Sequence, residues 1–138
     1  MDIKTWLGQY RKALDYAIKC FRELDSVDVS VKSPNMDGMP RCTSTGDNVE
    51  RIAIMRVALS DRADKARREA LEMAEEIYNT IETLEDYGQR TVLILRYIYG
   101  YSWEEVAQNM DTSRRTVLRL HGRALEILRR MKDGKENT

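Results

Sequence analysis

Residues 91–131 read TVLILRYIYGYSWEEVAQNMDTSRRTVLRLHGRALEILRRM, and this stretch decides the fold of the last third of the chain. It extends over three amphipathic segments at about residues 89–99, 102–110 and 113–132. Gly100 can take the left-handed backbone that ends a helix. Ser102 and Glu105 have the spacing of a capping box, in which the serine side chain caps the next helix. The stretch therefore predicts three short, packed helices.

The turn Asp111–Ser113 separates the second and third helices, and Ser113 can cap the third. Seven basic residues and a single acidic one, Glu126, lie between Ser113 and Lys132. By contrast, residues 47–87 carry six Lys/Arg and eleven Asp/Glu, and the whole chain has no net charge. A basic helix that follows a capped helix and a short turn indicates a helix-turn-helix that binds duplex DNA.

The major groove, about 12 Å wide, admits one α-helix, and the first turns of that helix meet the base edges. Arginine can donate two hydrogen bonds to guanine, so Arg114, Arg115 and Arg119 are predicted to contact bases. Arg123 and Arg129 suit phosphate contacts further along. The predicted DNA-binding residues are Ser113, Arg114, Arg115, Thr116, Leu118, Arg119 and Arg123.

The same stretch resembles region 4 of bacterial sigma-70-class factors. The matching elements are Leu95-Arg96-Tyr97, Gly100, Ser102, Glu105-Val106-Ala107, Thr116-Val117 and Arg123-Ala124-Leu125. The resemblance implies that Arg114, Arg115 and Arg119 approach the −35 promoter element. His121 and Arg115 depart from the residues common in that family, so its DNA sequence preference does not carry over. The segment that melts promoters has no counterpart, so the chain is not a complete sigma factor.

Residues 1–87 predict a long helical hairpin. Apolar residues recur at three- and four-residue spacing from Ile3 to Leu24, which predicts a helix ending near Asp25 or Ser26. Residues 27–46 lose this period and predict a loop, although VDVSVK alternates as a short strand would.

A second helix, capped by Asp47 or Asn48, is predicted to run to about Tyr87 close to a heptad pattern. Its alanine-rich middle allows close helix approach, and a second copy of the chain could cover the rest of its apolar stripe. We therefore predict an all-α fold with a helical arm (residues 1–87, loop 27–46) and a DNA-binding domain (residues 88–138).

No catalytic or metal-binding pattern stands out. His121 is the single histidine, which excludes a histidine triad or multi-histidine metal site, and we interpret it as a packing residue. Cys20 and Cys42 are too few for a zinc site and predict reduced thiols. The acidic pairs Glu75-Glu76 and Glu104-Glu105 suit exposed helix surface. We expect no enzyme activity and no cofactor.

The N-terminal residues mix charged and apolar side chains, unlike a signal peptide, and the chain has no run of 18 apolar residues. We expect a cytoplasmic protein that does not enter a membrane. The whole chain, including Met39-Pro40-Arg41 in the loop, is also similar to small phage and prophage late-transcription regulators of the ArpU/RinA type.

The predicted function is that of a sequence-specific DNA-binding transcriptional regulator whose helix 113–132 enters a promoter's major groove. Its expected partner is double-stranded DNA, and the arm would serve as a homodimer contact, a contact with RNA polymerase, or both. Two alternatives remain open. The first is a phage DNA-packaging protein similar to a small terminase subunit, which would assemble as a ring. The second is a sigma mimic whose basic helix contacts polymerase instead of DNA.

Overall fold

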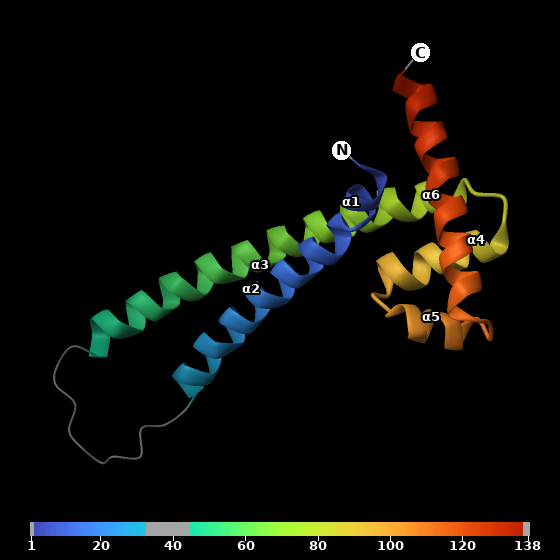
Figure 1. Cartoon of the computed structure of the whole chain (residues 1–138). Coiled ribbons are helices and arrows are strands. Elements are labelled where there is room, and N and C mark those ends of the chain that lie inside the picture. The colour runs from blue at the N-terminus through green and yellow to red at the C-terminus, as the bar shows by residue number, and fades with distance from the viewer. Residues whose placement is uncertain (1, 33–44, 137–138) are drawn as a thin grey trace. The chain divides into compact units, whose positions relative to one another are not determined.

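The computed structural model describes residues 2–32 and 45–136, and every regular element in those ranges is a helix (Figure 1). The elements are α1 (Ile3–Leu7), α2 (Gln9–Lys32), α3 (Thr45–Glu82), α4 (Tyr87–Leu93), the π-helical η1 (Ile94–Ile98), α5 (Trp103–Asn109) and α6 (Arg114–Glu136). The predicted all-α fold is confirmed. None of the described helices is both long and apolar enough to cross a bilayer.

The chain packs as two compact units. One comprises Ala13–Ala70, and the other joins Met1–Lys12 to Leu71–Thr138. This division differs from the predicted boundary between residues 87 and 88, because both ends of the predicted arm pack within the unit that holds the C-terminal helices.

The Ala13–Ala70 unit is built from α2 and α3, which lie side by side (Figure 1). Ala17 and Cys20 of α2 pack against Ala63 and Ala66 of α3, and the Phe21 ring lies partly buried beside them. Small side chains let helix backbones approach closely but bury little apolar area each. Ala63 and Ala66, two of the alanines in the middle of α3, thus pack against α2.

The predicted end of the first helix near Asp25 or Ser26 is wrong. A break at Gly8 separates α1 from α2, and α2 then continues to Lys32, so VDVSVK is helical and forms no strand. An established helix gains a hydrogen bond with each added residue, and residues 27–32 contain no proline or glycine to stop it. At the other end of the expected loop, α3 already begins at Thr45. Residues 33–44, including Met39-Pro40-Arg41 and Cys42, lie outside the described residues.

The second unit has a core shared by α1, the end of α3, α4, η1 and α6. Its buried members are Ile3, Leu7, Ile77, Ile81, Leu84, Leu93, Tyr97, Ala124, Leu125 and Leu128. Leu7, Ile81 and Leu93 are fully buried. Burial of a large aliphatic side chain contributes about 1.5–3 kcal/mol, so this shared core holds the C-terminal helices in place.

Helix α3 ends at Glu82, several residues before the predicted end at Tyr87. The reason lies in Asp86, whose side chain accepts a hydrogen bond of 3.0 Å from the Gln89 backbone N–H and thereby starts α4. An N-cap residue has extended backbone, so one uninterrupted helix cannot pass through it.

The predicted helix over residues 89–99 is divided into α4 and η1. The Tyr99 N–H donates to the Ile94 carbonyl at 3.0 Å, which is the five-residue spacing of a π-turn. Gly100 follows with a φ of 75°, as its predicted left-handed role requires. The wider turn shifts the residues after Ile94 around the helix axis and buries Leu95 and Tyr97.

Candidate nucleic-acid interface

Helices α5 and α6 are joined by a short turn with a defined backbone. The Ser102 hydroxyl accepts from the Glu105 N–H at 3.2 Å and caps α5, and the Ser113 hydroxyl accepts from the Thr116 N–H at 3.2 Å and caps α6. Both predicted caps are confirmed. Between them, Asp111 has a φ of 53°, a left-handed conformation that non-glycine residues adopt at a cost.

A small apolar core fixes α5 against α6. Its buried residues are Val92, Leu95, Val106, Ala107 and Val117, with Tyr101, Trp103, Met110 and Leu120 packed partly buried around them. Val117 lies one turn into α6, so burying it orients the first turns of that helix. The three-helix packing predicted from the sequence is present, with η1 as part of its first helix.

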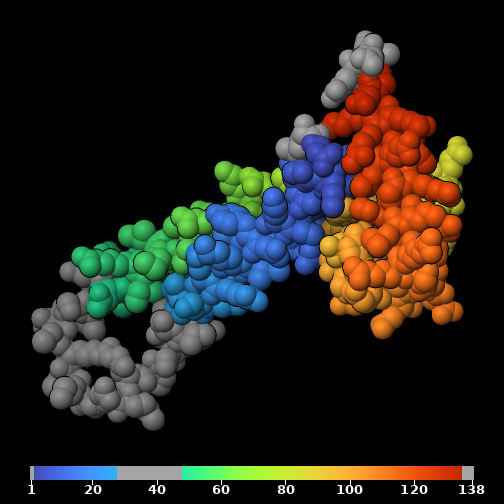
Figure 2. Space-filling model, viewed as in Figure 1, coloured from blue at the N-terminus to red at the C-terminus, as the bar shows by residue number. Residues whose placement is uncertain are grey.

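The buried face of α6 comprises Val117, His121, Ala124, Leu125 and Leu128. Arg115, Leu118, Arg119 and Gly122 recur at three- and four-residue spacing and are all exposed, which places them together on the other side of α6. Leu118 is 42% exposed and is the apolar member of this side. In the space-filling view α5 and α6, in orange to red, lie at the molecular surface (Figure 2).

The predicted arginines differ in their surroundings. Arg114 is exposed and forms an ion pair of 3.1 Å with Glu104 of α5. Within the described part of the chain, Arg115, Arg119 and Arg123 are exposed and take part in no ion pair. Their guanidinium groups remain available to an anionic partner, whereas Arg114 must first break its ion pair with Glu104.

The remaining predicted site residues lie at the start of the helix or farther along it. The Ser113 and Thr116 hydroxyl groups form a hydrogen bond with an oxygen–oxygen distance of 2.9 Å, and Thr116 is half-buried. Arg129, predicted to suit a phosphate, lies 3.7 Å from an Asp2 carboxylate oxygen. Among the arginines of α6, those that are exposed without an ion pair therefore lie in its first three turns.

A cluster of Arg96, Trp103 and His121 lies on the buried side of α6, and of its members the sequence did not indicate Arg96. The Arg96 guanidinium lies 4.5 Å from the centre of the Trp103 ring and donates to the Tyr101 carbonyl at 2.9 Å. The Trp103 ring meets His121 edge-on, with ring centres 4.7 Å apart. These contacts join η1, α5 and α6. The positive charge of Arg96 is attracted to the face of the Trp103 ring, which stabilises the contact between these two side chains. The alternating aromatic residues 97–103 were the available signal.

His121 is the buried member of this cluster, and its interpretation as a packing residue is confirmed. Its ring stacks on Tyr97, and its Nε2 lies 2.8 Å from the Tyr97 hydroxyl. Burial, followed by the positive charges of Lys4, Arg96 and Arg129, lowers the pKa of His121 to about 4. Burial likewise raises the pKa of Tyr97. Both side chains are therefore neutral at physiological pH.

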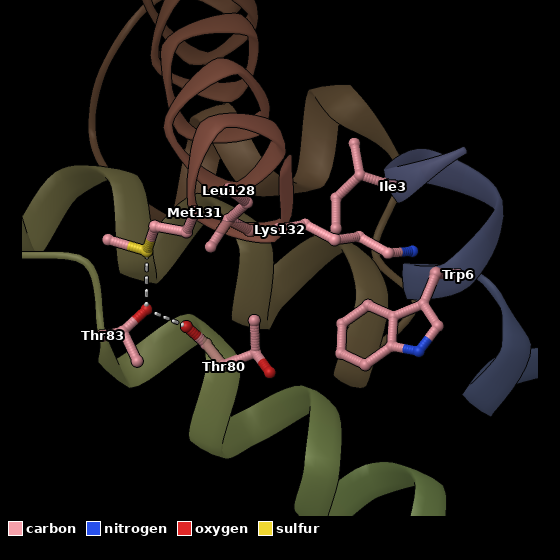
Figure 3. A pocket seen from close by; sticks show the side chains of 7 residues that line it. All are labelled: Ile3, Trp6, Thr80, Thr83, Leu128, Met131 and Lys132. Carbon is pink, nitrogen blue, oxygen red and sulfur yellow. Dashed lines mark hydrogen bonds between the residues drawn. The ribbon is translucent and has the colours of Figure 1, made fainter. Parts of the chain in front are cut away.

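A pocket of about 440 Å³ lies in the unit that joins Met1–Lys12 to Leu71–Thr138 (Figure 3). It is lined by Ile3, Trp6, Thr80, Thr83, Leu128, Met131 and Lys132. Its walls are mostly apolar. The Thr83 hydroxyl donates to the Thr80 carbonyl at 2.6 Å and lies 3.5 Å from the Met131 sulfur. None of these residues belongs to the predicted DNA-binding set. Among the described residues, no three His, Cys, Asp or Glu side chains are grouped as a metal site would need.

The capped α5, the short turn and the outward-facing α6 define a helix-turn-helix. Residues 86–130 match the model of the family described as Sigma-70, region 4. The matched segment extends from the N-cap of α4 to most of α6, so the helix-turn-helix is similar to sigma-70 region 4, as predicted. Domains of that family bind DNA and RNA polymerase and are not enzymes. No curated protein and no solved structure matches the chain.

Proposed function

We propose that this chain is a cytoplasmic, sequence-specific DNA-binding transcriptional regulator of phage or prophage type, which inserts the first turns of α6 into the major groove of a promoter. One observation carries the proposal. Arg115 and Arg119 lie exposed and without ion pairs on the side of α6 away from Val117. The Ser113 cap and the core around Val117 fix the direction in which this side faces.

The chemistry of these side chains supports direct reading of base edges. A guanidinium group can donate two hydrogen bonds to guanine O6 and N7, and an exposed leucine can contact a thymine methyl group. Arg115 and Arg119 are one helical turn apart, with Leu118 beside them on the same face. Arg123, one turn beyond Arg119, would contact a phosphate, and Ser113 and Thr116 would do so at the helix start.

The first experiment measures binding of the full chain to a fluorescent random duplex over a range of salt concentrations. Phosphate contacts release counterions, so the logarithm of the association constant should fall linearly with the logarithm of salt concentration. Absence of binding at low salt would favour the sigma mimic that contacts polymerase instead.

Footprinting on the neighbouring genome then supplies a specific duplex. Arg115→Ala and Arg119→Ala should each weaken binding to it roughly 5- to 150-fold and relax specificity at one base pair. Arg130→Ala is the matched control, because Arg130 is an exposed arginine of α6 paired with Glu126 at 2.7 Å. Equal affinity and specificity for both arginine variants and the wild type would refute the proposal.

We further propose that α3 mediates a homodimer. Val49, Ile54, Met55 and Val57 are each more than half exposed near its start, where burial by a partner would be favourable. Molar mass in solution tests this. A dimer is expected, a monomer at micromolar concentration would contradict the dimer, and a ring of about eight to ten copies would favour the DNA-packaging function.

A further inference from the structure

Gly122 lies in the interior of α6 on the same exposed face as Arg115 and Arg119. A Cβ atom added at Gly122 would have no neighbouring atom within 4 Å apart from its own helix backbone. Gly134, near the end of α6, is open in the same way, whereas Gly100 and Gly88 differ. At Gly100 the backbone is left-handed, and at Gly88 an added Cβ would touch Asp86 and Leu120 at 3.4 Å. The backbone and the close Arg11 side chain therefore explain Gly100, whereas no contact of the described residues explains Gly122, which, unlike Gly134, lies on the face that carries Arg115 and Arg119.

A glycine inside a helix lowers stability relative to alanine, because its backbone loses more conformational freedom on folding. The environment of Gly122 would accept a methyl group without any shift. No contact within the described structure therefore compensates for the stability that the glycine costs at this position. A glycine also lets another molecule approach the helix backbone more closely than any other residue does. A closely approaching partner would account for it.

The position of Gly122 along α6 indicates which part of a duplex would reach it. Nine residues separate it from the Ser113 cap, which is about 14 Å at 1.5 Å per residue. The major groove is about 12 Å wide. If the first turns of α6 lie at the base edges, the backbone at Gly122 has reached the edge of the groove, where a sugar–phosphate strand runs.

The charges around Gly122 agree with a phosphate strand at that point. Arg119 precedes it by three residues and Arg123 follows it directly, and both are exposed without ion pairs. One turn further on, Glu126 is the next residue on the same face, paired with Arg130. A carboxylate there would repel a phosphate, so the surface suited to DNA ends between Gly122 and Glu126.

We propose that Gly122 is the point at which one sugar–phosphate strand passes against the α6 backbone as the helix leaves the major groove, with Arg119 and Arg123 on either side of that strand. This inference rests on the proposed function, in which α6 binds duplex DNA. It adds to that interface a residue whose side chain has no hydrogen-bond donor. Any side chain at position 122 would hold the strand away from the helix.

The test compares Gly122→Ala and Gly122→Leu with Gly134→Ala and Gly134→Leu. Gly134 also lies within α6, and an added Cβ there likewise meets nothing within 4 Å. All four substitutions favour the helix, so thermal unfolding midpoints should rise by roughly 2–4 °C or stay unchanged. The variants at Gly122 should nevertheless bind random duplex more weakly, by roughly fivefold for alanine and more than about tenfold for leucine. The variants at Gly134 should bind within about twofold of wild type.

The outcomes separate this inference from the proposed function. If the wild type and Gly122→Leu bind duplex equally well, the strand does not pass at Gly122, and the DNA-binding proposal stands. If the wild type itself fails to bind duplex, both fall. If Gly122→Leu retains duplex binding but no longer captures RNA polymerase, the close partner is a protein and the inference is overturned.

Discussion

The Tyr97 hydroxyl oxygen lies 2.8 Å from Nε2 of His121, and this hydrogen bond joins η1 to the buried face of α6. Tyr97 is buried in η1, and the Trp103 and His121 rings are packed in a T-shaped arrangement. The arginine-bearing side of α6 is therefore backed by neutral, hydrogen-bonded aromatic groups. This arrangement predicts how the stability of the protein depends on pH and on the Tyr97 hydroxyl group.

His121 should titrate near pH 4 instead of 6.5, because burial and nearby cations oppose its protonation. Its folded pKa is lowered, so its contribution to stability is complete above the unfolded pKa of 6.5 and is lost as the pH falls towards 4. The loss would reach about 3 kcal/mol if the full shift is realised. His121 is the chain's single histidine, so one imidazole NMR signal reports it. Titration at 6.5 would contradict the prediction.

Tyr97→Phe should lower the free energy of unfolding by about 1–3 kcal/mol, because it leaves a buried imidazole nitrogen without its hydrogen-bond partner. Urea unfolding at pH 7 measures this change. Tyr99→Phe is the control, since Tyr99 is 57% exposed and its hydroxyl can bond to water. Equal losses for the two variants would argue against the buried hydrogen bond.

Gly100→Ala should destabilise the second unit by about 1–2 kcal/mol or more, since an alanine at a φ of 75° is strained. The added Cβ would also lie 2.6 Å from Cζ of Arg11. Arg11→Ala removes this crowding and leaves the backbone strain, so the double variant should recover only part of the loss. Gly8→Ala is a control with ordinary backbone and an added Cβ no closer than 3.5 Å to its neighbours. Full recovery in the double variant would show that the strain is negligible.

Two substitutions of Asp111 should differ in stability. Asp111→Gly relieves the left-handed backbone and should leave stability unchanged or raise it, whereas Asp111→Ala should be less stable than the glycine variant by about 1 kcal/mol. Thermal unfolding of the pair isolates the effect of the Cβ atom. A more stable alanine variant would be inconsistent with a left-handed residue in this turn.

Glu104→Gln should strengthen duplex binding, by roughly two- to fivefold at low salt, because it removes a carboxylate from the proposed interface and frees Arg114. Its effect on stability should be below about 1 kcal/mol, since both partners of the ion pair are exposed. Anisotropy titration measures the affinity. Glu126→Gln is a charge-matched control farther along α6, and its effect should be smaller. Weaker binding of Glu104→Gln would show that the ion pair positions Arg114 productively.

Local rules were sufficient for the helix-turn-helix. Ser102 and Ser113 cap the helices predicted to follow them, and Gly100 takes the predicted left-handed backbone. These features depend on residues three or four apart, which the sequence displays directly. The identities of the exposed α6 residues likewise follow from helical periodicity, whereas their roles on DNA stay predictions.

What the sequence could not show depends on tertiary packing. Leu95 and Tyr97 are both buried in the π-helical η1, and periodicity alone does not distinguish this element from a regular helix. The pairing of Arg114 with Glu104 requires the angle between α5 and α6. The extension of α2 over VDVSVK was missed because an alternating pattern also suits a strand, and nothing local excludes either conformation.

Burial of Ile3 and Leu7 beside Leu125 and Leu128 has a consequence for how the protein is made. During translation these early side chains leave the ribosome more than a hundred residues before the segment that covers them. The second unit can close only after α6 has emerged, and closing so long a loop is slow. A fragment that starts at residue 88 would lack Ile3, Leu7, Ile77, Ile81 and Leu84, which pack in one core with its Leu93, Leu125 and Leu128, so removing the arm should destabilise the helix-turn-helix.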